Sequence, residues 1–70
     1  MSNILYLNKE LYKKNTLERA AIDYASLASV VINDSDRYWE LVFSDCLVSS
    51  KRTMNEFENY VIDLSVQEGV

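Results

Sequence analysis

The fold depends on the stretch Tyr38-Trp39-Glu40-Leu41-Val42-Phe43, which contains the only Trp of the chain. Successive side chains of an extended backbone point to opposite sides, so Trp39, Leu41 and Phe43 share one face and the other three residues share the second. This alternation is typical of a strand with one buried face. We therefore predict a strand over residues 37–44 and expect the rest of the chain to pack around it.

Two apolar segments nearer the N-terminus also predict strands. The run Ile4-Leu5-Tyr6-Leu7 lacks polar alternation, which favours a strand that is covered on both faces. Residues 29–33 contain three consecutive β-branched side chains, which suit a pleated strand better than a helix. The turn formers Asp34-Ser35-Asp36 follow, so residues 29–44 predict a β-hairpin whose loop length stays open by a residue or two.

A first amphipathic helix is predicted over residues 16–27. Asn15 is expected to cap its N-terminus, and Glu18 lies at the spacing of a capping box. Its apolar stripe is Leu17, Ala20, Ala21, Tyr24, Ala25 and Ala28. The polar connection before it, residues 9–14, carries Leu11 and Tyr12, which we expect to fold back over the core.

A second amphipathic helix is predicted over residues 50–67. Ser49, Ser50 and Thr53 compete as its N-cap, and Gly69 is expected to stop it. Its apolar stripe is Met54, Phe57, Tyr60, Val61 and Leu64.

The order β-α-β-β-α predicts a small α+β fold in one domain, residues 1–70. Both helix stripes can be buried only if the two helices lie on one face of a three-stranded sheet, as a two-layer sandwich. We expect strand 37–44 in the middle, antiparallel to both others, which gives a truncated ferredoxin-like arrangement. The alternative is a right-handed β-α-β unit in which strands 4–7 and 29–33 are parallel neighbours. The expected inner face is Val30, Ile32, Trp39, Leu41 and Phe43.

This arrangement leaves one edge and one face of the sheet without cover. Strand 4–7 becomes an edge with unpaired backbone groups, which is a place where another strand can add. The outer face would carry apolar side chains, and exposed apolar patches often mark contacts. We therefore expect a protein or peptide partner to bind at Tyr6, Val31, Tyr38 and Val42.

Composition limits the classes of function. The net charge is −4, with seven basic residues, which disfavours nucleic acid and anionic membrane surfaces as partners. One Cys and no His exclude an internal disulfide and disfavour a zinc site. A core of this size rarely supplies more than roughly 3–5 kcal/mol, which favours association, including a homodimer. The apolar runs are too short to span a bilayer and the N-terminus has no signal-peptide pattern, so we expect a cytoplasmic protein.

Few side chains suggest catalysis. Asp34 and Asp36 are best explained as turn acids, and Cys46 as a small buried thiol that no His can activate. The acidic run 55–59 lacks the spacing and the Gly of a calcium loop. We therefore expect no catalytic, cofactor or metal residue and a non-catalytic protein. Two alternatives stay open: a ligand-binding or thiol-dependent enzyme domain that uses Cys46, and a nucleic-acid regulator.

The opening strand, the hairpin and several further positions form a pattern along nearly the whole chain: Tyr12, Leu17, Ala20-Ala21, Tyr24 and Phe57-x-Asn59-x-x-x-Asp63. In these features the chain resembles a known family, the D proteins of the His-Xaa-Ser system. Family members tend to have a basic residue after that Asp, where this chain has Leu64. The resemblance implies an accessory role beside a radical S-adenosylmethionine enzyme that modifies peptides, with the iron–sulfur chemistry in that partner enzyme.

Overall fold

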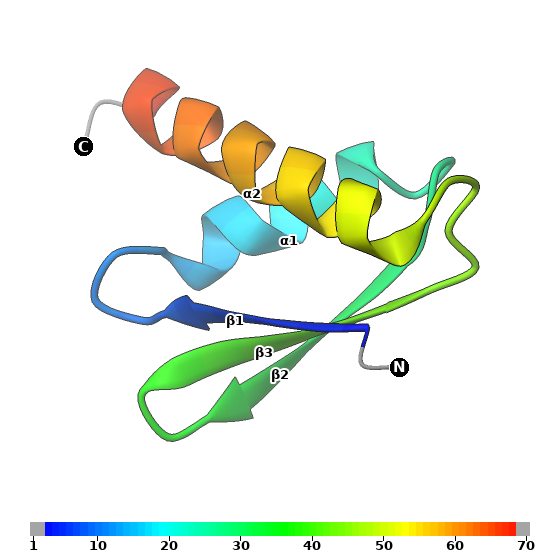
Figure 1. Cartoon of the computed structure of the whole chain (residues 1–70). Coiled ribbons are helices and arrows are strands. Elements are labelled where there is room, and N and C mark those ends of the chain that lie inside the picture. Colours follow the sequence, from blue (N-terminus) through cyan, green and yellow to red (C-terminus); the bar gives the residue numbers. More distant parts are fainter. Residues whose placement is uncertain (1–2, 69–70) are drawn as a thin grey trace.

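The computed structural model describes residues 3–68 and has the predicted order of elements (Figure 1). These elements are β1 (Ile4–Asn8), α1 (Lys14–Asp23), β2 (Ser29–Ser35), β3 (Tyr38–Ser44) and α2 (Ser50–Gln67). The α+β prediction is confirmed. The stop predicted at Gly69 lies outside the described residues, within which α2 already ends.

The sheet has the order β1-β3-β2, and β3 is antiparallel to both neighbours. Strand β3 therefore lies in the middle, as predicted, and the alternative with β1 and β2 as parallel neighbours is wrong. Both helices lie on the same side of the sheet, so the molecule has two layers (Figure 1). Within residues 3–68, no helix covers the other face of the sheet.

Aromatic rings hold the two layers together. Phe57 of α2 contacts Phe43 of β3 and Tyr24 at the end of α1, each with ring centroids 5.2 Å apart and edge-on rings. Edge-on pairs are worth about 0.5–1.5 kcal/mol beyond their buried area. The core around them consists of Leu7, Leu17, Ala20, Ala28, Leu41, Phe43, Phe57, Val61 and Leu64.

The connection between β1 and α1 covers the core only in part. Tyr12 packs against the core as predicted, and its carbonyl accepts a hydrogen bond from the indole Nε1 of Trp39 at 3.0 Å. Leu11, which was expected to fold back with it, is 72% exposed. The amides of Leu11 and Tyr12 both donate to the Asn8 carbonyl, and Leu11 lines an open pocket together with Ile62 and Val66 of α2.

The boundaries of α1 differ from the prediction because tertiary packing overrides the local capping signal. The helix begins at Lys14, so Asn15 lies inside its first turn and does not cap it; Lys13 occupies the cap position without a side-chain bond. The early start places Thr16 and Leu17 in the core. At the other end, the chain leaves the helix after Asp23 and continues as turns to Leu27.

The hairpin turn is tighter than predicted. Ser35 pairs with Tyr38, so Asp34 and Ser35 belong to β2 and only Asp36 and Arg37 form the loop. Asp36 has φ 21°, and a positive φ at the first loop residue fits the turns that suit two-residue hairpins. Asp34 is instead a strand residue whose carboxylate forms an ion pair with Lys9.

The start of α2 resolves the competition among its N-cap candidates. The Ser49 side chain accepts a hydrogen bond from the Arg52 amide, so Ser49 is the N-cap. Thr53 lies inside the helix, where it is buried and its hydroxyl donates to the Ser49 carbonyl.

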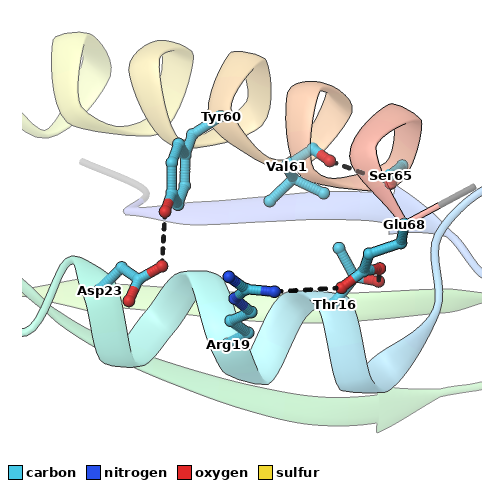
Figure 2. Close-up of polar contacts among 7 residues, drawn as sticks. All are labelled: Thr16, Arg19, Asp23, Tyr60, Val61, Ser65 and Glu68. Carbon is cyan, nitrogen blue, oxygen red and sulfur yellow. Dashed lines mark hydrogen bonds and ion pairs between the residues drawn. The ribbon is translucent and has the colours of Figure 1, made fainter.

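Acidic side chains tie the two helices to each other (Figure 2). Glu68, just after α2, accepts a hydrogen bond from the Thr16 hydroxyl at 2.6 Å and lies 3.9 Å from the Arg19 guanidinium. At the other end of α1, the Tyr60 hydroxyl donates to Asp23 at 2.5 Å. The first turn of α1 has no acidic residue of its own, so Glu68 supplies the negative charge that a helix N-terminus favours.

We predict that Glu68→Gln lowers the free energy of unfolding by about 0.5–1.5 kcal/mol, since it removes a charge beside a helix N-terminus and a charge-assisted hydrogen bond. Urea denaturation followed by circular dichroism measures the change. The control is Glu58→Gln on the same helix, because Glu58 takes part in none of the side-chain hydrogen bonds recorded for residues 3–68. It should shift stability by less than about 0.5 kcal/mol. Equal effects of the two variants would contradict the role of Glu68.

Candidate binding face

The strand register gathers the predicted contact residues on the sheet face that the helices leave bare. Directly paired residues share a face, so the register produces three rows across β1, β3 and β2. We call these nine residues the outer face: Ile4–Val42–Val31, Tyr6–Glu40–Asn33 and Asn8–Tyr38–Ser35.

All four residues singled out from the sequence lie on the outer face. Tyr6 and Val31 are each 54% exposed and Tyr38 is 46% exposed, whereas Val42 in the central strand is half-buried by its neighbours. Tyr6 and Tyr38 touch edge-on, with ring centroids 6.4 Å apart. The first row is entirely apolar, and the second and third rows carry the two rings.

One expectation about β1 is wrong. Its apolar run predicts cover on both faces, but only the face with Leu5 and Leu7 packs against the core. Tyr6 points to the bare face and is exposed. Apolar composition alone does not separate a strand buried on both sides from one whose second face is apolar and uncovered.

Glu40 lies at the centre of the outer face and is not among the four contact residues expected from the sequence. One carboxylate oxygen accepts a hydrogen bond from the Tyr6 hydroxyl and the other from the Asn33 side-chain amide, each at 3.3 Å. Both donors are neutral. The ion pairs recorded within residues 3–68 join Lys9 to Asp34, Arg19 to Glu68 and Arg52 to Glu56, and none includes Glu40.

A signal for Glu40 was present in the sequence. A charged residue at the middle of the central strand, alternating with Trp39 and Leu41, must lie on the second face of the sheet. The sequence could not show that Tyr6 and Asn33 flank it, because that contact depends on the strand order and on the register of two separate pairings.

The carboxylate of Glu40 affects the ionisation of Tyr6. The hydrogen bond to Glu40 is the main cause that raises the pKa of Tyr6 above 10.0, and the Coulombic repulsion between the carboxylate and a phenolate adds to it, with a smaller contribution from burial. Tyr6 therefore stays protonated as a donor throughout the physiological range. The pair presents a fixed negative charge beside an aromatic ring.

The residues that could suggest catalysis are not brought together. Asp34 and Asp36 lie at the hairpin end of β3, whereas Cys46 follows the opposite end of that strand. Cys46 is half-buried and packs against the core. In residues 3–68, no group of three or more His, Cys, Asp or Glu residues has the geometry to hold a metal ion.

Comparison with known proteins found no matching family model, no matching curated protein and no matching solved structure. Within the described part of the chain, neither helix combines the length and the apolar composition that crossing a membrane requires.

We predict that Glu40→Gln lowers the pKa of Tyr6 toward 10.0, because the variant removes the charge that opposes the phenolate. The ring-carbon chemical shift of Tyr6, followed by NMR against pH, measures this. Tyr60, whose pKa is raised chiefly by Asp23, is the internal control and should not move. An unchanged Tyr6 titration would mean that the two side chains do not interact in solution.

The raised pKa of Tyr6 also fixes the pH range in which its contact with Glu40 stabilises the fold. The folded-state pKa lies above the unfolded value, so the contribution is fully present below about pH 10 and disappears as the pH rises through the folded-state pKa. In the wild type, this contact makes the free energy of unfolding fall as the pH rises through the folded-state pKa of Tyr6. In Glu40→Gln, this fall in the free energy of unfolding should be absent.

Proposed function

We propose that this protein is a small, non-catalytic binding module of the cytoplasm, and that its outer face takes a peptide or protein segment with a Lys or Arg side chain next to apolar residues. The observation that carries the proposal is Glu40. Its carboxylate lies in the middle of an exposed face, satisfied by two neutral donors and without a cationic partner among the recorded ion pairs.

The surroundings of Glu40 favour a cationic side chain over a neutral one. A carboxylate attracts an ammonium or guanidinium group directly, and hydrogen bonds with a charged group at both ends are the stronger kind. The rings of Tyr6 and Tyr38 lie beside it, and aromatic faces also attract cations. The net charge of −4 adds a long-range attraction for a basic segment.

The neighbouring row favours apolar residues next to that cation. Ile4, Val42 and Val31 form a continuous apolar strip across all three strands. The strip is two residues along the strands from Glu40, which corresponds to roughly 6.5–7 Å. If an extended segment ran along the strands, one of its side chains could lie on the apolar strip and the side chain two residues away could reach Glu40.

The family resemblance supplies one candidate for the biological process. A D protein of the His-Xaa-Ser system would act beside a radical S-adenosylmethionine enzyme, and the bound segment would then belong to the precursor peptide or to that enzyme. Genes for such an enzyme and for a short precursor next to this one would support that role. Their absence would leave the binding module without this assignment.

The thiol-dependent alternative has less support. A nucleophilic Cys needs a base or a nearby positive charge to become a thiolate, and the chain contains no His. The acids of the hairpin are at the far end of β3 from Cys46, so they cannot form one site with it.

We predict that peptides selected by the wild-type protein from a random peptide display library are enriched in Lys or Arg flanked by apolar residues. Glu40→Gln keeps the shape but removes the charge; its amide oxygen can accept from Asn33, and its amide nitrogen can donate to the Tyr6 hydroxyl. It should weaken binding of these peptides about tenfold, the factor that corresponds to about 1.4 kcal/mol, as measured by calorimetry.

Two further variants make this experiment decisive. Glu56→Gln on α2 is the matched control: it changes the net charge equally, lies on the helical layer and should leave peptide binding unchanged. Tyr38→Lys with Val42→Lys should abolish binding, because it removes one ring, interrupts the apolar strip and repels a basic segment. If the selected peptides show no basic enrichment, or bind Glu40→Gln as tightly as the wild type, the outer face does not have the proposed specificity.

A further inference from the structure

Strand β2 has an open edge whose hydrogen-bonding groups can be identified. The Phe43 amide donates to the Asn3 carbonyl at 2.8 Å, so the backbone groups of Phe43 point toward β1. Backbone groups alternate in direction along a strand, so those of Val42 point toward β2 and bond its partner Val31. The N–H and C=O groups of Val30 and Ile32 then point away from β3, to the free side of β2.

This edge lacks the features with which proteins usually prevent strand addition. Exposed edges are commonly blocked by Pro, by Lys or other charged residues, or by bulges. Residues 29–33 are Ser-Val-Val-Ile-Asn, with no charge and no Pro, and they pair with β3 without interruption. The first charged residue of β2, Asp34, is already paired with Lys9.

The groove along this edge is apolar. Val30 and Ile32 of β2 line a shallow, open groove together with Ala21 and Ile22 of α1, and Glu18 is the one charged residue of its lining. Ile22 is 74% exposed, and this places a large apolar side chain in water beside an unpaired strand. A strand that added to β2 would cover the groove and Ile22 together.

We infer that the strand that occupies this edge is β2 of a second copy of the chain, in an antiparallel pair whose two-fold axis passes through Val31. The segment is complementary to itself in that register. Val30 lies opposite Ile32 of the second copy, and Ile32 lies opposite Val30 of the second copy. Each of these two pairs exchanges two backbone hydrogen bonds, through the N–H and C=O groups that point away from β3 in a single chain. Val31 lies opposite its own copy, and Ser29 lies opposite Asn33.

Charge selects this register over its neighbour. If the axis passed through Ile32, the backbone donors and acceptors of the two strands would still match. Val30 would then lie opposite Asp34 of the second copy, and a carboxylate would be placed against the apolar inner face. The axis at Val31 pairs only uncharged residues within 29–33. It also joins the two apolar strips of the outer faces into one, through the contact of Val31 with its copy.

The dimer does not depend on the outer face having a peptide partner. It joins two three-stranded sheets into one sheet of six strands, and it removes from water the apolar groove of a domain whose own core is small. The exposed Val31 side chains remain on the outer face, so the dimer would still present both copies of that face.

Two measurements on the unmodified protein test the inference. Light scattering at the concentrations of an NMR sample should give a mass twice the 8.1 kDa of one chain, falling on dilution. Amide hydrogen exchange should show protection of Val30 and Ile32 that increases with protein concentration, whereas Val31 is protected at all concentrations by its bond to β3. A mass of one chain with fast exchange at Val30 and Ile32 overturns the proposal.

Variants then test where the contact is. Ile22→Glu should weaken dimerisation about tenfold or more by placing a charge in the covered groove. Val66→Glu on α2, at a residue that is also 74% exposed, is the matched control and should leave the dimer intact. A dimer that survives Ile22→Glu with Val30 and Ile32 unprotected forms through another surface and overturns the proposal.

The register has its own test. Because Val31 lies opposite itself, Val31→Lys and Val31→Glu should each weaken the dimer through like charges. An equal mixture of the two variants should restore it as a heterodimer. If the mixture stays monomeric while each folded variant keeps its circular dichroism spectrum, the axis does not pass through Val31.

Discussion

The contact of the Phe57 ring with Phe43 and Tyr24 determines the rest of the structure. It joins α2 to the central strand and to the end of α1, so both helices are held against the same face of the sheet. Both helices of the described residues cover that face of three short strands, and neither lies on the other face (Figure 1). The bare outer face is therefore a consequence of how the core is packed.

The chemistry of the outer face follows from the alternation of β3. The same six residues that place Leu41 and Phe43 in the core place Glu40 and Val42 on the other side. A solvated sheet face usually carries mixed polar residues, but here an apolar strip adjoins a carboxylate held by Tyr6 and Asn33. Because those donors are neutral, the negative charge is oriented but not neutralised, and the proposed preference for a basic segment rests on this charge.

The two edges of the sheet differ although both are unpaired within residues 3–68. Neither β1 nor residues 29–33 of β2 contain a charged residue, and the ion pair of Lys9 with Asp34 joins the residue after β1 to the end of β2, so charge does not distinguish the two edges. The difference is the apolar side chain that lies beside one of them. Along β2, the uncharged β-branched segment is open and lies beside Ile22. Val31 belongs to both surfaces, since its side chain lies on the outer face while the backbone of its neighbours forms the edge. The proposed partner-binding face and the proposed dimer edge therefore adjoin at Val31.

The sequence by itself determined the number, type and order of the elements, because periods of two and 3.6 residues encode which face of each strand and helix is apolar. It also placed Tyr6, Val31, Tyr38 and Val42 on one face and predicted the full extent of α2. Tertiary structure decided the start of α1, where burial of Thr16 and Leu17 prevailed over the capping signal of Asn15. It also decided the turn at Asp36-Arg37, the setting of Glu40 between Tyr6 and Asn33, and the contact of Glu68 with α1. Each of these joins residues far apart in the chain or depends on strand register, and local sequence patterns carry no information about either.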